Sequence, residues 1–275
     1  MNAIAKELPQ ELVTKVSGVS EAAKIAYETK RYLDARNLVL NNKQDILTVD
    51  GNTAVQAFRK WAYAAYYLGN EGNPQWKKGI IDNPVFYEES VAVALEAIEK
   101  FTTLIDIEAR IAILNVLALA TRWIKNKDGN FKRKEAYQWS DQAILEAKIS
   151  SNLGLVSVAL NTRNILLSED KRFKEAEAGC IEVATNSLLV GDYLTAGHGK
   201  QNEGDTYRRE IEEIKDNQEK AALHLKAYLA YREAQALYTF YENQSGNKAT
   251  AHLESAGRKA EEEKAFALKA KINHN

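Results

Sequence analysis

The stretch Asn130-Phe131-Lys132-Arg133-Lys134-Glu135-Ala136 has a counterpart further along the chain, Lys171-Arg172-Phe173-Lys174-Glu175-Ala176. Each stretch joins an aromatic residue to a following Lys-Glu-Ala and stands between two segments of helical period. A repeated unit of helix, short turn and helix is typical of an α-solenoid, because one pair cannot bury its apolar face without a neighbour. We therefore predict an all-α fold of stacked antiparallel helix pairs, with a generic helical bundle as the alternative.

The composition is that of an ordinary folded protein with balanced charge. Of the 275 residues 45% are hydrophobic, and 37 basic residues face 38 acidic ones. This balance argues against a protein built mainly to coat nucleic acid, which needs a broad positive field. With Cys180 as the one cysteine no intramolecular disulfide can form, which favours a reducing compartment. We expect a cytoplasmic protein.

No stretch has the pattern of a membrane span or a secretory leader. The residues after Met1 lack the charged-then-apolar order of a signal peptide. The most apolar run, residues 111–124, is interrupted by Asn115 and Arg122 and is too short to cross a bilayer. We therefore expect no membrane contact.

Helical periodicity covers most of the chain, and the last of the three prolines is Pro84. Ser20 is expected to cap one helix, and Thr53 with Gln56 fits a capping box that starts another. Residues 69–84 hold three glycines and two prolines and are expected to form a long loop. The predicted helices cover about residues 3–16, 20–40, 53–68, 86–103, 107–126, 131–149, 153–168, 172–189, 193–214, 217–242 and 248–272.

Small and aromatic residues of these pairs resemble those of tetratricopeptide repeats. In that family a small residue and, three positions later, an aromatic or large apolar one lie on the first helix, and the second helix opens with alanine. The matching residues are Ala64, Tyr67, Ala120, Trp123, Gly204 and Tyr207 in first helices, Gly129-Asn130-Phe131 and Lys171-Arg172-Phe173 in turns, and Ala136, Ala143 and Ala176 in second helices. Small residues let two helices approach closely, while the aromatics fill the gaps between pairs.

Two departures from the family pattern stand out. The second-helix positions Val91, Ala136, Ala176 and Ala221 are spaced by 45, 40 and 45 residues, whereas the repeat period of the family is 34. Asn164 also occupies a position where the family has a small residue. The sequence is therefore interpreted as a divergent relative with long helices.

The resemblance implies a concave groove, lined by the first helices of successive pairs, that binds a peptide or protein partner. On this basis we predict a protein-interaction adaptor or regulator. Asparagine and arginine suit such a groove because they bind peptide backbone and carboxylates while exposed. The expected groove residues are Trp61, Thr121, Asn161, Gln201, Asp205 and Arg208, with Leu117 and Ile165 beside them.

A basic stretch supports an alternative function in nucleic-acid binding. Between residues 122 and 134 six cations face Asp128 alone, and Trp123 and Phe131 supply aromatic rings for base stacking. The competing interpretation is that the two rings are packing residues and the lysines complement a helix C-terminus. The acidic stretch 210–219 offers a charge complement in a homo-oligomer. The six cations are Arg122, Lys125, Lys127, Lys132, Arg133 and Lys134.

The sequence carries no recognisable catalytic signature. No histidine stands at metal-binding spacing, and no nucleophile elbow or phosphate-binding loop occurs. Gly197-His198-Gly199-Lys200 is interpreted as a helix start or kink, and Cys180 as a small buried hydrophobe. We predict no enzyme activity, no cofactor and no metal. The remaining alternative is a helical small-ligand sensor or enzyme with a pocket near the loop 69–84.

Three segments are predicted along the chain. Residues 1–50 would form an N-terminal helical cap or self-association segment. Residues 51–242 would form the repeats, and residues 243–275 a C-terminal capping helix with a polar outer face.

Overall fold

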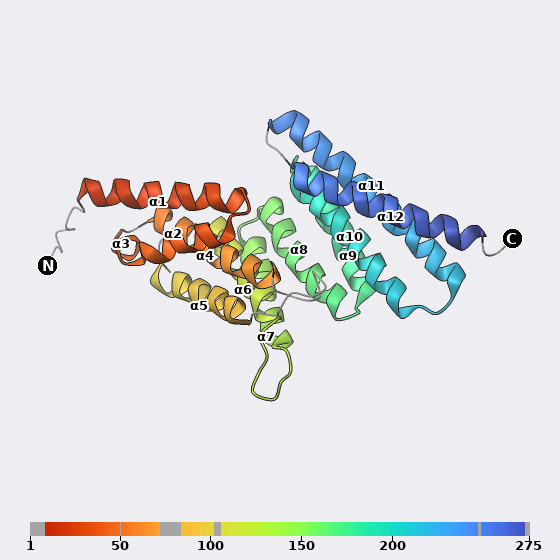
Figure 1. Ribbon diagram of the computed structural model, residues 1–275, viewed down its shortest axis with the longest axis horizontal. Coiled ribbons are helices and arrows are strands. Elements are labelled where there is room, and N and C mark those ends of the chain that lie inside the picture. Colours follow the sequence, from red (N-terminus) through yellow and green to blue (C-terminus); the bar gives the residue numbers. More distant parts are fainter. Residues whose placement is uncertain (1–8, 50, 72–83, 102–105, 247–248, 273–275) are drawn as a thin grey trace. The chain divides into compact units, whose positions relative to one another are not determined.

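The chain is helical throughout the part that its computed structural model describes, residues 9–49, 51–71, 84–101, 106–246 and 249–272. In these residues the only β-type pairing is an isolated antiparallel bridge between Lys125 and Phe131. The prediction of an all-α fold is confirmed. The described helices (Figure 1) are α1 (Gln10–Glu28), α2 (Tyr32–Asn41), α3 (Lys43–Thr48), α4 (Asn52–Glu71), α5 (Pro84–Lys100), α6 (Ile107–Thr121), α7 (Arg133–Ile149), α8 (Leu153–Glu169), α9 (Phe173–Leu189), α10 (Tyr193–Glu213), α11 (Asn217–Ser245) and α12 (Thr250–Ile272).

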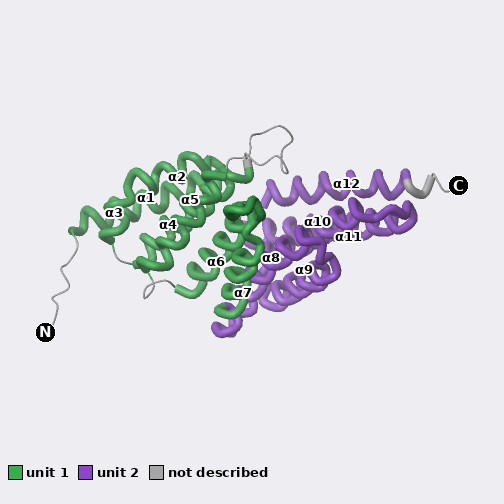
Figure 2. The backbone as a smooth tube through the Cα atoms, turned by 90° about the horizontal axis from the view of Figure 1, so that it is seen from below, with its two compact units in different colours: residues 1–146 green, residues 147–275 purple. Residues whose placement is uncertain are grey.

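Two compact units divide the chain, Met1–Glu146 and Ala147–Asn275 (Figure 2). In unit 1, α1 contacts α2 and α4, and α4 contacts α5 and α6. In unit 2, α8 contacts α9 and α10, α10 contacts α11, and α11 contacts α12. Contacts between near neighbours along the chain are those of stacked helix pairs. The finer division into an N-terminal cap, repeats and a capping helix stays a prediction.

A regular register links the four helices α7 to α10. They begin at residues 133, 153, 173 and 193, so that one helix and its turn take 20 residues and a pair takes 40. The turns place Ser151, Lys171 and Gly191 in the left-handed region, with φ of 55°, 61° and 75°. In the second of these turns the Arg172 N–H donates to the Leu167 carbonyl (2.9 Å) and the Lys171 N–H to the Ser168 carbonyl (3.3 Å). This is a Schellman motif, which supplies partners for the last carbonyls of α8.

Small residues are buried in the helix pairs at the positions predicted for packing, Ala136, Ala176 and Gly204. Both alanines are fully buried, and a Cβ added to Gly204 would lie 2.6 Å from the Tyr231 ring on α11. In the pair α8 and α9 the small residue has moved to the second helix: a Cβ at Gly179 would collide with the Asn164 side chain. Asn164 therefore departs from the family pattern without opening the pair.

The N-terminal boundaries differ from the prediction. One helix, α1, runs through Ser20, whose hydroxyl donates to the Thr53 carbonyl (3.4 Å) instead of capping a helix. The break comes at Lys30, where φ is 60°. The capping box at Thr53 is also wrong: the Val55 N–H donates to the Gly51 carbonyl (3.4 Å), so α4 starts before the threonine.

The predicted loop 69–84 lies mostly outside the described residues. Residues 69–71 belong to α4, and residues 84 onward to α5. None of the described helices is both long and apolar enough to cross a membrane.

Candidate partner-binding groove

The polar stripe predicted on α10 is engaged by neighbouring helices of unit 2. Gln201 accepts a hydrogen bond from the Tyr238 hydroxyl of α11 (3.0 Å). Asp205 accepts one from the Tyr231 hydroxyl (2.6 Å) and pairs with Lys259 of α12 (2.5 Å). These contacts place α11 and α12 against the face that the sequence assigned to a partner.

Arg208 completes this contact between α10 and α12. Its Nε lies 3.1 Å from Oε1 of Glu263, and its Nη2 lies 3.4 Å from Glu262. Glu263 is 1% exposed, and its other oxygen lies 2.6 Å from Nδ1 of His224. A carboxylate buried this deeply needs such partners, because its desolvation is costly.

The remaining predicted groove residues are bonded within the chain or buried. Asn161 of α8 accepts a hydrogen bond from the Asn202 side chain of α10 (2.8 Å). Trp61 is 4% exposed and donates through Nε1 to Glu89 (2.6 Å), and Thr121 is 2% exposed. The expectation that Trp61 and Thr121 face an open groove is therefore corrected, because both belong to the core of unit 1. Partner binding by the other four residues stays a prediction.

Unit 1 has an open groove that none of these predicted residues lines; it lies between α1 and α4 and beside the start of α6. Its volume is about 520 Å³. Its lining combines five hydroxyl or amide side chains with five charged ones. We call it the α1–α4 groove; its lining residues are Ser17, Ser20, Glu21, Lys24, Asn52, Thr53, Gln56, Arg59, Lys60 and Glu108.

Lys60 is the residue of this groove that differs most from an ordinary surface lysine. Its ammonium group lies 4.7 Å from the centre of the Tyr27 ring, in cation–π geometry. Burial, and then the nearby Arg59, lower the pKa of Lys60 from its usual value. The Glu28 and Glu21 carboxylates act in the opposite direction, but neither forms an ion pair with Lys60 within the described residues.

Tyrosines of α1, α2 and α4 form an aromatic cluster around the Tyr27 ring, which the Lys60 ammonium contacts. The rings of Tyr32 and Tyr67 stack at 4.9 Å, and Tyr27 lies 5.9 Å from Tyr67 and 6.3 Å from Tyr63. Burial raises the pKa of Tyr27 well above its usual value, so this ring remains neutral. The spacing of Tyr63 and Tyr67, four residues apart on one helix, is the sequence signal that indicates this cluster.

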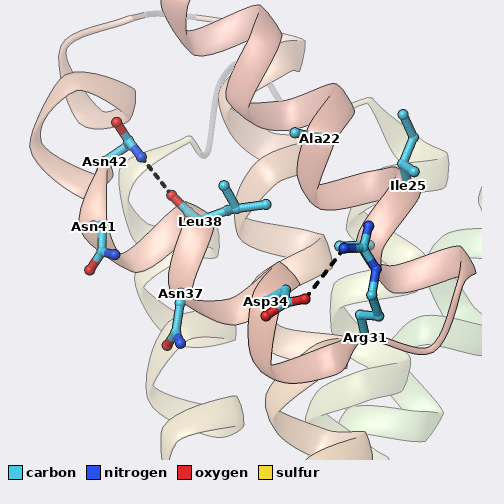
Figure 3. Close-up of a pocket in the computed structure, with 9 residues that line it drawn as sticks. Ala22, Ile25, Arg31, Asp34, Asn37, Leu38, Asn41 and Asn42 are labelled. Carbon is cyan, nitrogen blue, oxygen red and sulfur yellow. Dashed lines mark hydrogen bonds and ion pairs between the residues drawn. The ribbon is translucent and has the colours of Figure 1, made fainter.

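A second groove of about 520 Å³ lies between α1 and α2 (Figure 3). Its walls combine Ile25 and Leu38 with polar residues, and most of these polar groups already have partners. Asn42 donates to the Leu38 carbonyl (2.8 Å), and Arg31 lies 3.5 Å from Asp34 (Figure 3). The two grooves do not differ in this respect, because most polar side chains of the α1–α4 groove are also bonded or paired within the chain.

The basic stretch forms an ordered hairpin between α6 and α7. Arg122 is not part of its surface: it is 1% exposed, and its Nη2 donates to the Tyr66 hydroxyl (3.2 Å). Trp123 is buried as well. The expectation of six exposed cations beside two stacking rings is therefore corrected to five cations and one partly exposed ring, that of Phe131.

Catalytic and metal chemistry has little geometric support in the part of the chain that the structure describes. There, no three His, Cys, Asp or Glu side chains are grouped to hold a metal ion. Cys180 is buried as predicted, and burial raises the pKa of its thiol to about 12. The absence of enzyme activity stays a prediction.

Comparisons with known proteins give no family. No protein-family model matches the chain, and no curated protein matches it. Among solved structures, BtubC (BKLC) from P. vanneervenii is similar over 97% of this chain and 94% of its own, at 13% identity and a TM-score of 0.45. A signal transduction ATPase with numerous domains, which has a tetratricopeptide repeat sensor, from Pyrococcus horikoshii is similar at 13% identity and a TM-score of 0.49. The match covers 93% of this chain and 37% of that one.

Proposed function

We propose that this protein is an interaction scaffold that binds an extended segment of a partner protein in the α1–α4 groove. The observation that carries the proposal is Lys60, a desolvated cation on the Tyr27 ring that has no ion pair within the described residues. A partially buried charge without a counterion is unfavourable. A carboxylate of a bound segment would compensate it.

The lining of the groove suits an extended peptide. Ser17 and Thr53 carry hydroxyl groups that donate and accept hydrogen bonds, which the main chain of an extended segment requires. Helices α1, α4 and α6 are neighbours in the stack, so that the groove follows the first helices of successive pairs, as the resemblance to tetratricopeptide repeats implies.

Site-specific crosslinking in the native cell tests the proposal. A photoreactive residue replaces Ser17, which is exposed in the α1–α4 groove, or Asn41, which is exposed in the α1–α2 groove. We expect partner adducts from position 17 and few from position 41, identified by mass spectrometry.

The substitution Lys60→Met in the Ser17 variant should abolish these adducts. Lys148→Met, at an exposed lysine of unit 2, is the matched control and should leave them unchanged. Equal adducts from both grooves, or adducts that survive Lys60→Met, would contradict the proposal.

A further inference from the structure

The hairpin between α6 and α7 is a preorganised loop. The Lys132 N–H donates to the Ile124 carbonyl (2.9 Å), and the Asn126 N–H donates to the Asn130 carbonyl (2.8 Å). The Asn126 side-chain oxygen accepts from the N–H groups of Asp128 and Asn130 (2.9 and 3.0 Å). Gly129 takes the left-handed position at the tip, with φ of 81°.

This loop presents positive charge that is largely unused. Lys125, Lys127 and Lys134 are exposed, and neither Lys127 nor Lys134 forms an ion pair within the described residues. Lys132 pairs locally with Glu135 (3.2 Å). Asp128 is the one acidic residue between Lys125 and Lys134.

The aromatic part of the loop is covered by its own cations. Phe131 is 39% exposed, and Lys125 and Arg133 lie over its ring, at 5.3 and 5.8 Å from the centre. Arg133 also lies 5.7 Å from the centre of the buried Trp123 ring. Binding of single-stranded nucleic acid relies on open ring faces on which bases stack. The rings here hold cations in place instead.

We infer that this hairpin, residues 124–134, is a docking site for an acidic segment of another protein. Carboxylate side chains complement its five cations without needing a stacking platform. Because main-chain hydrogen bonds and cation–π contacts already fix the loop, binding orders few additional groups. The site is separate from the α1–α4 groove and does not depend on it.

Fluorescence anisotropy with a labelled Asp/Glu-rich peptide tests the inference. The full-length protein should bind the peptide more weakly as salt rises, because the charges are exposed. K127E/K134E should weaken binding by about tenfold or more. The matched control is K148E/K215E, which makes the same change in net charge at two exposed lysines outside the hairpin. It should change the affinity by less than about twofold.

Three outcomes would overturn the inference. Equal weakening by both double variants would mean that the peptide senses only net charge. Loss of binding in Lys60→Met, with K127E/K134E unaffected, would place the peptide in the α1–α4 groove. A single-stranded oligonucleotide that binds more tightly than the peptide, and that K127E/K134E also disrupts, would assign the hairpin to nucleic acid.

Discussion

Helix α4 of unit 1 and helix α10 of unit 2 both carry polar faces, but charged residues on these two faces differ in whether the chain itself supplies an opposite charge. In unit 1, Lys60 lies in an open groove with no carboxylate paired to it among the described residues. In unit 2, Asp205 and Arg208 each meet an opposite charge from α12. A polar stripe on a helix therefore does not reveal whether its partner belongs to the same chain or to another. The difference predicts opposite effects on stability when a cation of either face is removed.

Arg208→Ala should give the largest loss of stability. The substitution leaves the buried Glu263 carboxylate with His224 alone, and we expect the free energy of unfolding to fall by about 2–4 kcal/mol. The sequence placed Arg208 on an exposed groove surface, where a substitution would change stability by less than about 0.5 kcal/mol. Chemical denaturation measures the effect.

The control is Arg258→Ala, at an exposed arginine of α12, which should change the free energy of unfolding by less than about 0.5 kcal/mol. Equal effects would mean that the α12 contact contributes little.

Acid should weaken the α10–α12 contact through a histidine. Burial, and then the adjacent His252, lower the pKa of His198 to about 4, while Asp192 acts in the opposite direction. Its ring centre lies 4.7 Å from that of His252 and 5.7 Å from that of Tyr238. The unfolded chain binds a proton below about pH 6.5 and the folded chain only near pH 4. The stability contributed by neutral His198 is therefore present above pH 6.5 and lost as the pH falls to about 4.

Comparison of the wild type with His198→Phe isolates this contribution. Between pH 7 and pH 4.5 the wild type should lose about 2 kcal/mol more than the variant. The difference between the two proteins is the relevant quantity, because carboxylates protonate in both. Parallel losses would show that His198 does not respond to pH in this range.

Ala136→Leu in unit 1 and Ala176→Leu in unit 2 compare the packing of the two units at equivalent positions, 40 residues apart. Both alanines are fully buried, so that added methyl groups should cost about 1–3 kcal/mol in each. Ala222→Leu, at an exposed position of α11, is the control and should cost less than about 0.5 kcal/mol. A tolerated leucine at only one position would show that the two units pack their helix pairs differently.

The sequence predicted what local pattern determines and missed what depends on distant segments. The helices from residue 133 to residue 213 were placed within about two residues, because turns and amphipathic periodicity mark their ends. Burial of Gly204 and Tyr207 followed from their spacing in the same way. The partner of Asp205, by contrast, is Lys259, which lies 54 residues further on and follows from no periodicity. Similarly, the burial of Arg122 depends on Tyr66 of a different helix pair.

The N-terminal errors have a related cause. Ser20 has the side chain of a helix cap, but the apolar positions Val16 and Ala23 continue one face across it, and both are buried. Burial of that continuous face outweighed the local preference for a cap. The same competition explains why Lys30, a residue without special turn propensity, takes the left-handed position that ends α1.

Lys60→Met should have the smallest effect and the opposite sign to Arg208→Ala. The lowered pKa shows that the fold disfavours the charged form of Lys60, so its removal should leave the free energy of unfolding at pH 7 unchanged or raise it by up to about 1 kcal/mol. Loss of the cation–π contact with Tyr27 offsets part of this gain. The gain in free energy of unfolding from methionine should shrink as the pH rises through the lowered pKa of Lys60 toward that of an ordinary lysine.

Denaturant titrations of both proteins at pH 7 and pH 10, with Lys148→Met as the control, measure the sign of this difference. A loss above about 1 kcal/mol at pH 7 would show that Lys60 stabilises unit 1 as Arg208 stabilises unit 2, and the contrast between the two faces would then be lost.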